Sequence, residues 1–512
     1  MPWRARRELA LVLVLAAVSC SGPSTSTSQG SPRASRPVTA LAVLEAEDAQ
    51  TLDPALIDDP TSLTIGSEIF EGLTRLDARS RPGPGLAERW DVSDDGRTYT
   101  FHLRSTRYQS GAQVQAQDAV AVWTRALAPA TASPLTGFMA SLGGRHPGDQ
   151  PAGVQALDQR TLRVRLPAPD SEFLTLLSMP PFWLYDPSKP GDPSAGSGPY
   201  RLDQWQRGAQ LRLAANPNYW GGSPQVQSVT VNIEPDSNKR LDRFRRGEAD
   251  IAHGFTGPQL LAFERDPGQA AELHRVRLAR TTWLGFNSIA GSGYGAPQRM
   301  ALAQAIDRGR LSDLAQFGSL LAAPATDLLP PGMPGHIDRS LPAYNPPSAK
   351  FALDQAGFPS RIDLYMSTNS TVGRVARELQ AQIGDATGRT VALHPLGDFF
   401  TQASLDRLPL FIDTWSADVP YPADILESVI RTGAQFNNLR LSDSRVDAAL
   451  DQGRKASSFD DALAAYQQAE QITLNDNRLI PLYSGVEPYL VRVGVQASFT
   501  GGLIPYRWED VR

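Results

Sequence analysis

Apolar and polar residues alternate along several short segments of the chain, and between them lie segments in which apolar residues recur every three to four positions. These two spacings are typical of half-buried strands and amphipathic helices. In residues 90–104, every second position from Tyr99 to Leu103 is apolar, and Asp95 and Gly96 precede this run. Asp-Gly favours a tight two-residue turn. The pattern predicts a β-hairpin with one buried face.

A strand, a helix and a second strand are predicted in the segment that follows residue 228. Residues 229–233 alternate as a strand, and Asp236 or Ser237 can cap a short helix that Gly247 ends. Apolar residues return at 249–252. This order is typical of a chain that folds into mixed α/β layers.

Two further helices are predicted from capping and periodicity. Met300, Ala303 and Ile306 have the spacing of one helix face. Ser458 and Asp461 have the spacing of a capping box at the start of a later helix. No fixed period of self-similarity is visible along the chain, so we predict an α/β protein and neither a solenoid nor a propeller.

The N-terminus has the order of a secretory signal. Basic residues precede an apolar run from Leu9 to Val18, and small residues follow that run. The run is shorter than the roughly 20 apolar residues that a membrane-spanning helix needs. We therefore predict a signal peptide over residues 1–19.

Cys20 is the single cysteine of the chain, so a disulfide within the chain is excluded. The segment from Ala17 to Cys20 resembles the cleavage box of bacterial lipoproteins, which implies that Cys20 is lipidated; the alternative is an unmodified cysteine inside the signal. Residues 20–37 are rich in Ser, Thr, Pro and Gly, which predicts a flexible tether before a folded body that starts at Val38.

Composition excludes several classes of function. The 512 residues carry a formal net charge of −5 and no long basic run, which excludes the electrostatic footprint of a nucleic-acid-binding protein. The motifs of serine hydrolases, zinc proteases, redox dithiols and phosphate loops are absent from the sequence. The six histidines form no close pair with zinc-site spacing. We predict no catalytic residues, no metal site and no cofactor.

Many separated segments of the chain resemble one protein family, in that family's order. The longest reads SDDGRTYTFHLR, from Ser93 to Arg104. The others are Thr51–Pro54, Ile69–Leu73, Leu86–Trp90, Gly196–Tyr200, Asn216–Gly221, Arg246–Ile251, Gly285–Asn287, Ala301–Arg308, Ala352–Phe358, Trp415–Asp418, Arg445–Asp447 and Leu479–Tyr483. The set resembles the extracellular solute-binding proteins of family 5, the lipoproteins of ABC importers that bind oligopeptides, dipeptides or nickel.

The resemblance implies a large, two-lobed periplasmic-binding-protein-like fold of type II, with an extra α+β subdomain on the first lobe. It places lobe I at residues 38–280 and 479–512, the extra subdomain roughly at 66–194, and lobe II at 281–478. Such lobes close over a ligand by a hinge.

The resemblance also nominates ligand-binding residues. Peptide-binding relatives hold the free amino terminus with the aspartate of a Trp-x-x-Asp segment, which here runs from Trp415 to Asp418. Asp418 is therefore the predicted amine anchor, Trp415 a predicted pocket wall, and Asn287 a further candidate at the cleft. Without the family context, Asp418 fits a loop cap and Trp415 a core aromatic. Residues 366–372 lack the basic residue that dipeptide-binding relatives use for the carboxylate, which favours a longer or non-peptide ligand.

The function that the resemblance implies is capture of oligopeptides outside the cytoplasm and their delivery to the permease subunits of an ABC importer. The protein is expected to be a monomer, anchored by lipid to the extracytoplasmic face of the cell membrane. Three alternatives stay open: a receptor for a non-peptide solute such as a metal complex, haem or sugar, a ligand-presenting or chaperone-like lipoprotein without a transport role, and an exported hydrolase.

Overall fold

The computed structural model describes residues 38–143, 151, 153–291, 293–315, 320–404, 406–500 and 503–512. The predicted signal peptide, Cys20 and the predicted tether over 20–37 lie outside these described residues. In the part of the chain that is described, no helix combines the length and the apolar character needed to cross a membrane.

One large mixed sheet runs through the described chain. Its strands follow the order β15-β14-β16-β12-β17-β11-β1-β10-β9-β8, and β13 pairs with β17 beside this path. The bounds of its strands are β1 (Ala40–Glu45), β8 (Tyr200–Gln206), β9 (Gln210–Ala215), β10 (Ser228–Ile233), β11 (Ile251–His253), β12 (Leu273–Phe286), β13 (Ala322–Pro324), β14 (Arg361–Ser367), β15 (Thr390–Leu396), β16 (Leu410–Ser416) and β17 (Leu479–Val491).

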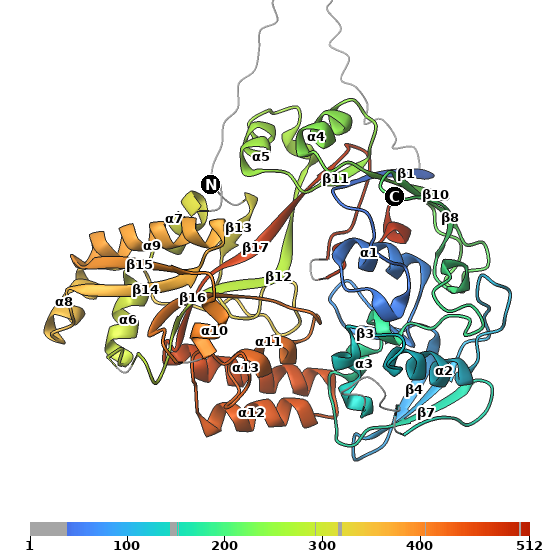
Figure 1. Cartoon of the computed structure of the whole chain (residues 1–512), viewed down its shortest axis with the longest axis horizontal. Helices are drawn as coiled ribbons and strands as arrows, with labels where there is room; N and C mark the ends of the chain where they lie inside the picture. The colour runs from blue at the N-terminus through green and yellow to red at the C-terminus, as the bar shows by residue number, and fades with distance from the viewer. Residues whose placement is uncertain are drawn as a thin grey trace, which may run out of the picture. The chain divides into compact units, whose positions relative to one another are not determined.

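The two longest strands, β12 and β17, link two groups of elements (Figure 1). They pair with each other in antiparallel fashion, β11 joins one side of the pair and β16 joins the other. Their register shifts between Arg277 and Thr281, where the regular ladder is interrupted. The predicted boundary between residues 280 and 281 falls at this irregularity, and the boundary before Leu479 falls where β17 begins.

The first group contains the predicted strand–helix–strand unit, as β10, α4 (Ser237–Arg245) and β11. β1 lies between β10 and β11 and runs parallel to both. The carboxylate of Asp236 accepts hydrogen bonds from the backbone N–H groups of Asn238 and Lys239, which confirms the predicted cap. α5 (Gly257–Glu264) packs beside α4 through the contact of Phe244 with Phe263.

A smaller four-stranded antiparallel sheet carries the predicted hairpin. Its order is β4-β5-β7-β6, and Tyr99, Phe101 and Leu103 of β5 are buried, which confirms the alternation. The elements of this region are α1 (Pro60–Ile69), β2 (Thr74–Leu76), β3 (Pro82–Pro84), β4 (Ala87–Val92), β5 (Thr98–Leu103), α2 (Ala116–Leu127), β6 (Val154–Ala156), β7 (Thr161–Arg165) and α3 (Phe173–Leu176).

The second group packs helices around β14, β15 and β16. Its helices are α6 (Ala296–Gln304), α7 (Arg308–Ala315), α8 (Pro346–Gln355), α9 (Ser370–Thr387) and α10 (Phe399–Ser404). Of the predicted helix face, Ala303 and Ile306 are buried, but the prediction is wrong for Met300. Met300 is 39% exposed, because α6 turns Leu302 and Ala303 toward the core, and Ile306 follows the end of the helix.

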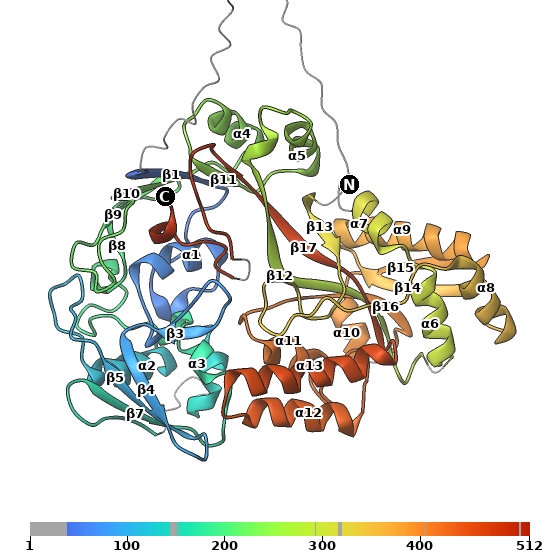
Figure 2. The same ribbon diagram turned by 180° about the vertical axis from the view of Figure 1, so that it is seen from behind.

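Three helices, α11 (Pro422–Val429), α12 (Ser444–Lys455) and α13 (Phe459–Asn475), follow β16. Ser458 caps α13 by accepting the backbone N–H of Asp461, as predicted. α12 and α13 lie side by side with one end toward α3 in both views (Figures 1 and 2). The backbone N–H of Ser171 donates to the carbonyl of Arg454 at 3.0 Å, which ties this end of α12 to the α3 region.

Candidate functional site

Three adjoining cavities lie where these elements meet. The central cavity has a volume of about 710 Å³ and the acidic cavity, beside α11 and α12, about 580 Å³. The C-terminal cavity, against residues 498–512, has about 760 Å³. The central cavity shares Asp418, Pro134 and Phe138 with the acidic cavity, and it shares Leu63, Met179 and Leu503 with the C-terminal cavity, so the three cavities adjoin.

The central cavity is bounded by both groups of elements. Residues 278–280, at the register shift of β12, form one wall, and residues 416–418, at the end of β16, continue it. Residues 57–64 and the ends of β1 and β11 face them from the first group. Most of the lining is apolar, and its larger apolar side chains are Ile57, Leu63, Leu135, Phe138, Met179, Leu278, Leu503, Tyr489 and Tyr506. A location between linked groups of elements, with an apolar wall and convergent polar groups, is typical of small-ligand sites.

A charged cluster of three residues lies in the wall of the central cavity. His253 Nε2 is 2.6 Å from Glu45, its Nδ1 is 3.4 Å from Glu487, and its ring stacks on Tyr489 at 4.8 Å between centroids. Burial alone would lower the pKa of His253, but the charges of Glu45 and Glu487 outweigh it and raise the pKa to about 10. The imidazole is therefore protonated at neutral pH.

Asp418 lies at the junction of the central and acidic cavities, because it lines both of them. Its side chain is exposed, and among the described residues no group donates a hydrogen bond to its carboxylate. Its backbone N–H donates to Asp424 Oδ2 at 3.4 Å, which fixes the loop. Partial burial raises the pKa of the Asp418 carboxyl. This placement gives a free carboxylate that a ligand cation can approach from either cavity.

Trp415 lies behind that carboxylate and lines none of the three cavities. Its indole Nε1 donates to Asp424 Oδ2 at 2.8 Å, and its ring meets Phe436 edge-on at 5.2 Å. Trp415 thus positions Asp424, which in turn holds the loop that carries Asp418. Its role as a pocket wall stays a prediction. What the geometry shows is a hydrogen bond that positions this loop.

Asn287 is 1% exposed and does not line these cavities. Its Oδ1 accepts the backbone N–H groups of Ile289 and Ala290, both at 2.8 Å. Its Nδ2 donates to the carbonyl of Asn438 at 3.2 Å and to Asp406 at 3.3 Å. The amide is used to shape the turn after β12, so a ligand contact by Asn287 stays a prediction that the geometry does not favour.

The acidic cavity collects carboxylates from segments far apart in the chain. Asp170 and Glu172 face it before α3, and Asp424 and Glu427 face it from α11. Arg454 of α12 forms an ion pair with Glu427. Tyr421 donates its hydroxyl to Ser171 Oγ at 2.9 Å, which ties the segment before α11 to the segment before α3.

Crowding of these carboxyls shifts their pKa values upward. Burial, and then the charges of Asp170 and Asp424, raise the pKa of Glu172 well above its ordinary value. Burial also raises the pKa of Asp424 to about 7, although the Trp415 hydrogen bond lowers it and the Asp418 charge adds to it. Two carboxyls of this cavity therefore hold protons near neutral pH until a cation compensates their charge.

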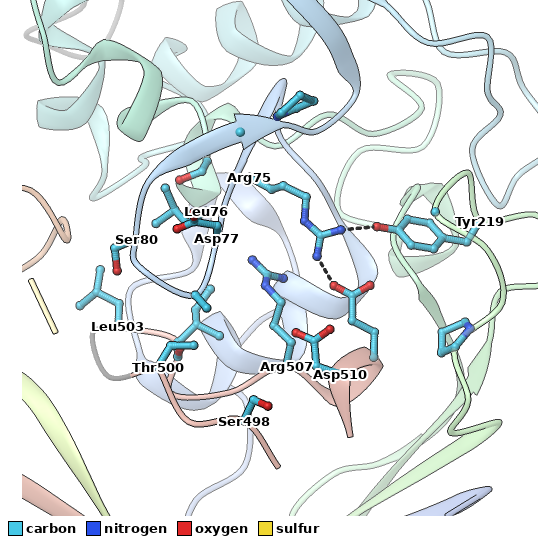
Figure 3. Close-up of a pocket in the computed structure, with 18 of the residues that line it drawn as sticks. Arg75, Leu76, Asp77, Ser80, Tyr219, Ser498, Thr500, Leu503, Arg507 and Asp510 are labelled. Carbon is cyan, nitrogen blue, oxygen red and sulfur yellow. Dashed lines mark hydrogen bonds and ion pairs between the residues drawn. The ribbon is translucent and has the colours of Figure 1, made fainter. Parts of the chain in front are cut away.

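The C-terminal cavity is charge-balanced, with Arg75, Arg507 and Arg512 set against Asp77, Glu509 and Asp510. Figure 3 shows the Arg507 guanidinium beside the Arg75–Glu509 ion pair. Arg75 also donates to the hydroxyl of Tyr219 at 2.8 Å. These contacts fasten the C-terminal segment to the first group of elements.

Sequence reasoning missed Asp424, Glu172 and the His253 cluster. Asp424 had one local signal, since it is an acidic residue in the first turn of α11. Glu172 and His253 had none, because their partners are hundreds of residues away. Among the described residues, no group of three or more His, Cys, Asp or Glu is arranged to hold a metal ion.

Comparison with known proteins gives a consistent result. The model of the bacterial extracellular solute-binding proteins, family 5 Middle, matches residues 81–437. The chain is 29% identical over 499 residues to the probable deoxycholate-binding periplasmic protein YgiS of Escherichia coli (strain K12), which covers 90% of each chain. It is 27% identical over 460 residues to the glutathione-binding protein GsiB of the same strain, which covers 84% of this chain and 86% of GsiB.

Solved structures share the fold. The unliganded open form of the periplasmic murein tripeptide-binding protein MppA matches with a TM-score of 0.83 at 22% identity, over 92% of this chain and 97% of MppA. Haemophilus influenzae OppA in complex with the peptide RPPGFSPFR matches with a TM-score of 0.64 at 21% identity, over 93% and 98% of the two chains.

Proposed function

This chain belongs to the bacterial extracellular solute-binding proteins of family 5, and we propose that it is a lipid-anchored receptor that captures oligopeptides and delivers them to the permease of an ABC importer. Members of this family bind substrates and are not enzymes, so the role proposed here is binding without turnover. The predicted lobes I and II, with boundaries at residues 280/281 and 478/479, are proposed to close around the ligand, and the receptor is proposed to act as a monomer.

The observation that carries the proposal is the unpaired carboxylate of Asp418 at the junction of two cavities. A peptide amino terminus is an ammonium group, which forms strong charge-assisted hydrogen bonds with a carboxylate. The central cavity provides an apolar wall for side chains, and the adjoining cavities provide room for a ligand longer than a dipeptide. GsiB and MppA are named for small peptides, which agrees with this ligand class.

One observation favours a second candidate, an amphipathic non-peptide solute. The central cavity is lined mainly by apolar side chains, and YgiS, with 90% coverage of this chain, is named for deoxycholate. A rigid apolar body with one polar end would fill such a wall by burial of apolar surface. An anionic end would, however, meet the carboxylates of Glu45, Asp59, Asp418 and Glu487 around the cavity.

The anchor is proposed on Cys20, with residues 20–37 as the tether. The test is mass spectrometry of the mature N-terminus from membranes of the native host. A diacylglyceryl mass on Cys20, and release of a Cys20→Ser variant from the membrane fraction, are the expected results. An unmodified Cys20 on a membrane-bound chain would refute this part.

The cargo is tested by native mass spectrometry of the soluble chain that starts after Cys20, purified from its own host and then denatured. A ladder of short peptides supports the oligopeptide receptor. A single steroid, metal complex or sugar refutes the peptide cargo and retains the receptor class. Disappearance of peptides from an incubated library, with new fragments in their place, would revive the hydrolase.

A further inference from the structure

Negative charge is concentrated in the central and acidic cavities. Over the whole chain, 54 acidic residues face 49 Lys and Arg, which is close to balance. Five carboxylates line the central cavity and five line the acidic cavity, with Asp418 common to both. The basic side chains in these linings are Arg280, Arg454 and His253. The carboxylates are Glu45, Asp58, Asp59, Asp170, Glu172, Asp418, Asp424, Glu427 and Glu487.

We infer that this cleft selects cationic ligands, namely oligopeptides that carry a Lys or Arg side chain next to a free amino terminus. The inference rests on the proposed function and names the substrate class of the same site. It assigns the amino terminus to Asp418 and the side-chain cation to Glu172 and Asp170 in the acidic cavity.

Several of these carboxylates are already compensated within the protein. His253 bridges Glu45 and Glu487, and Arg454 pairs with Glu427. These pairs lower the number of charges that a ligand has to meet, but they leave the remainder unbalanced.

The uncompensated carboxylates are the ones that point to a ligand. Within the described ranges, Asp58, Glu172 and Asp418 accept no hydrogen bond and form no ion pair. Asp59 Oδ1 caps α1 by accepting the N–H of Ser62, whereas its Oδ2 is buried at the cavity wall and has no partner. A buried carboxylate oxygen without a donor is costly, so a ligand cation at this surface removes an existing penalty.

The acidic cavity is the place for the second cation because one arginine faces four carboxylates there besides Asp418. Arg454 pairs with Glu427 and also attracts Asp170, whereas Glu172 is repelled by Asp170 and Asp424. An ammonium or guanidinium group reaching in from the Asp418 junction neutralises this repulsion. In a partly desolvated cavity that attraction is stronger than at an open surface.

The same geometry couples binding to protons. Burial and its neighbours raise the pKa of Glu172, so the free protein holds protons that an incoming cation displaces. Affinity for a cationic peptide should therefore rise with pH more steeply than affinity for a neutral peptide, whose only cation meets Asp418. The groups around Glu172 are Asp170 on its own segment, Tyr421, Asp424 and Glu427 at α11, Arg454 on α12 and Tyr466 on α13.

The test is isothermal titration of the soluble chain with Ala-Lys-Ala, Ala-Gln-Ala and Ala-Glu-Ala, which differ in one side chain. Ala-Lys-Ala is expected to bind at least about tenfold more tightly than Ala-Gln-Ala, because one charge-assisted hydrogen bond contributes about that factor in affinity. Ala-Glu-Ala should bind most weakly. Titrations in two buffers of different ionisation enthalpy should show more protons released on binding Ala-Lys-Ala than on binding Ala-Gln-Ala.

Glu172→Gln keeps the shape of the side chain and removes its charge. It should weaken Ala-Lys-Ala by about tenfold and leave Ala-Gln-Ala unchanged. Glu88→Gln, at an exposed position that lines none of the three cavities, is the matched control and should retain the preference. Equal affinity for the three peptides would overturn the inference and leave the peptide receptor intact, whereas binding of none of them would overturn the proposed function itself.

Discussion

Replacement of Asp418 by Asn is the most direct probe of the amine anchor. The change removes one charge and keeps the shape of the side chain. The carboxylate accepts no hydrogen bond from the described residues, so its removal breaks no intramolecular bond and should leave the fold intact. The backbone N–H of residue 418 still donates to Asp424, which keeps the loop in place.

The magnitude follows from the surroundings of the carboxylate. A charge-assisted hydrogen bond to a ligand that is enclosed on binding contributes about 1.5–3 kcal/mol, which corresponds to a 10- to 150-fold change in affinity. The side chain is exposed in this structure, and a pair that stays open to water is worth only about 0.2–1 kcal/mol. A loss above tenfold therefore requires that the cleft closes over the amine.

The assay is a double-mutant cycle by titration calorimetry. Wild-type and Asp418→Asn chains are each titrated with a tripeptide and with its N-acetylated form, and Asp203→Asn, an exposed strand position, serves as the control. Acetylation should weaken the wild type strongly and the variant little, because the coupling belongs to the amine–carboxylate pair. An equal loss for both peptide forms, or a coupling energy below about 0.3 kcal/mol, would refute the assignment of the amine to Asp418.

Three further predictions concern stability. The pKa of Asp424 is raised to about 7, so between pH 4 and 7 the folded chain keeps a proton that the unfolded chain releases. The free energy of unfolding should therefore fall as the pH rises, by up to about 1.4 kcal/mol per pH unit. Asp424→Asn should flatten that slope in urea unfolding at pH 5 and pH 8, and an unchanged slope would contradict the assigned pKa. Trp415→Phe removes the indole donor to Asp424 and should cost about 1–3 kcal/mol in the same experiment, and a loss below about 0.5 kcal/mol would mean that this hydrogen bond adds little. Gly72→Ala would place a Cβ 1.9 Å from the carbonyl oxygen of Leu177 and should destabilise the fold by about 1–3 kcal/mol or more. Gly397→Ala, whose new Cβ would have no atom within 4 Å, is the control and should be near neutral. Equal melting temperatures for the two variants would refute the packing argument.

The local elements could be predicted from the sequence because their causes are local. The alternation in β5, the Asp236 cap of α4 and the Ser458 cap of α13 depend on residues within a few positions of one another. The family segments added the fold, and the structural matches to MppA and OppA confirm an α/β fold of the two-lobed periplasmic-binding type. They also nominated Asp418, which lines the central cavity; its role as amine anchor stays a prediction.

Helix faces were harder to predict where the helix was short. The spacing of Met300 and Ile306 fits a helix, but α6 ends at Gln304 and turns Leu302 inward. Asn287 belongs to a family segment, yet its amide satisfies the turn after β12. In both positions a residue pattern was compatible with two environments, and the packing of distant segments selected one of them.

The charge of the cleft is a property of the tertiary structure alone. Glu45 and His253 are 208 positions apart. Asp170 and Glu172 lie near α11 in a region where Ser171 hydrogen-bonds to Tyr421 and to Arg454. Composition gives a nearly balanced chain, and no local pattern distinguishes a carboxylate that is paired with arginine from one that faces another carboxylate. The sequence by itself determined several local elements and the family, whereas only the fold decided which charges share a cavity. The reason is that electrostatic interaction depends on distance in space and not on separation along the chain.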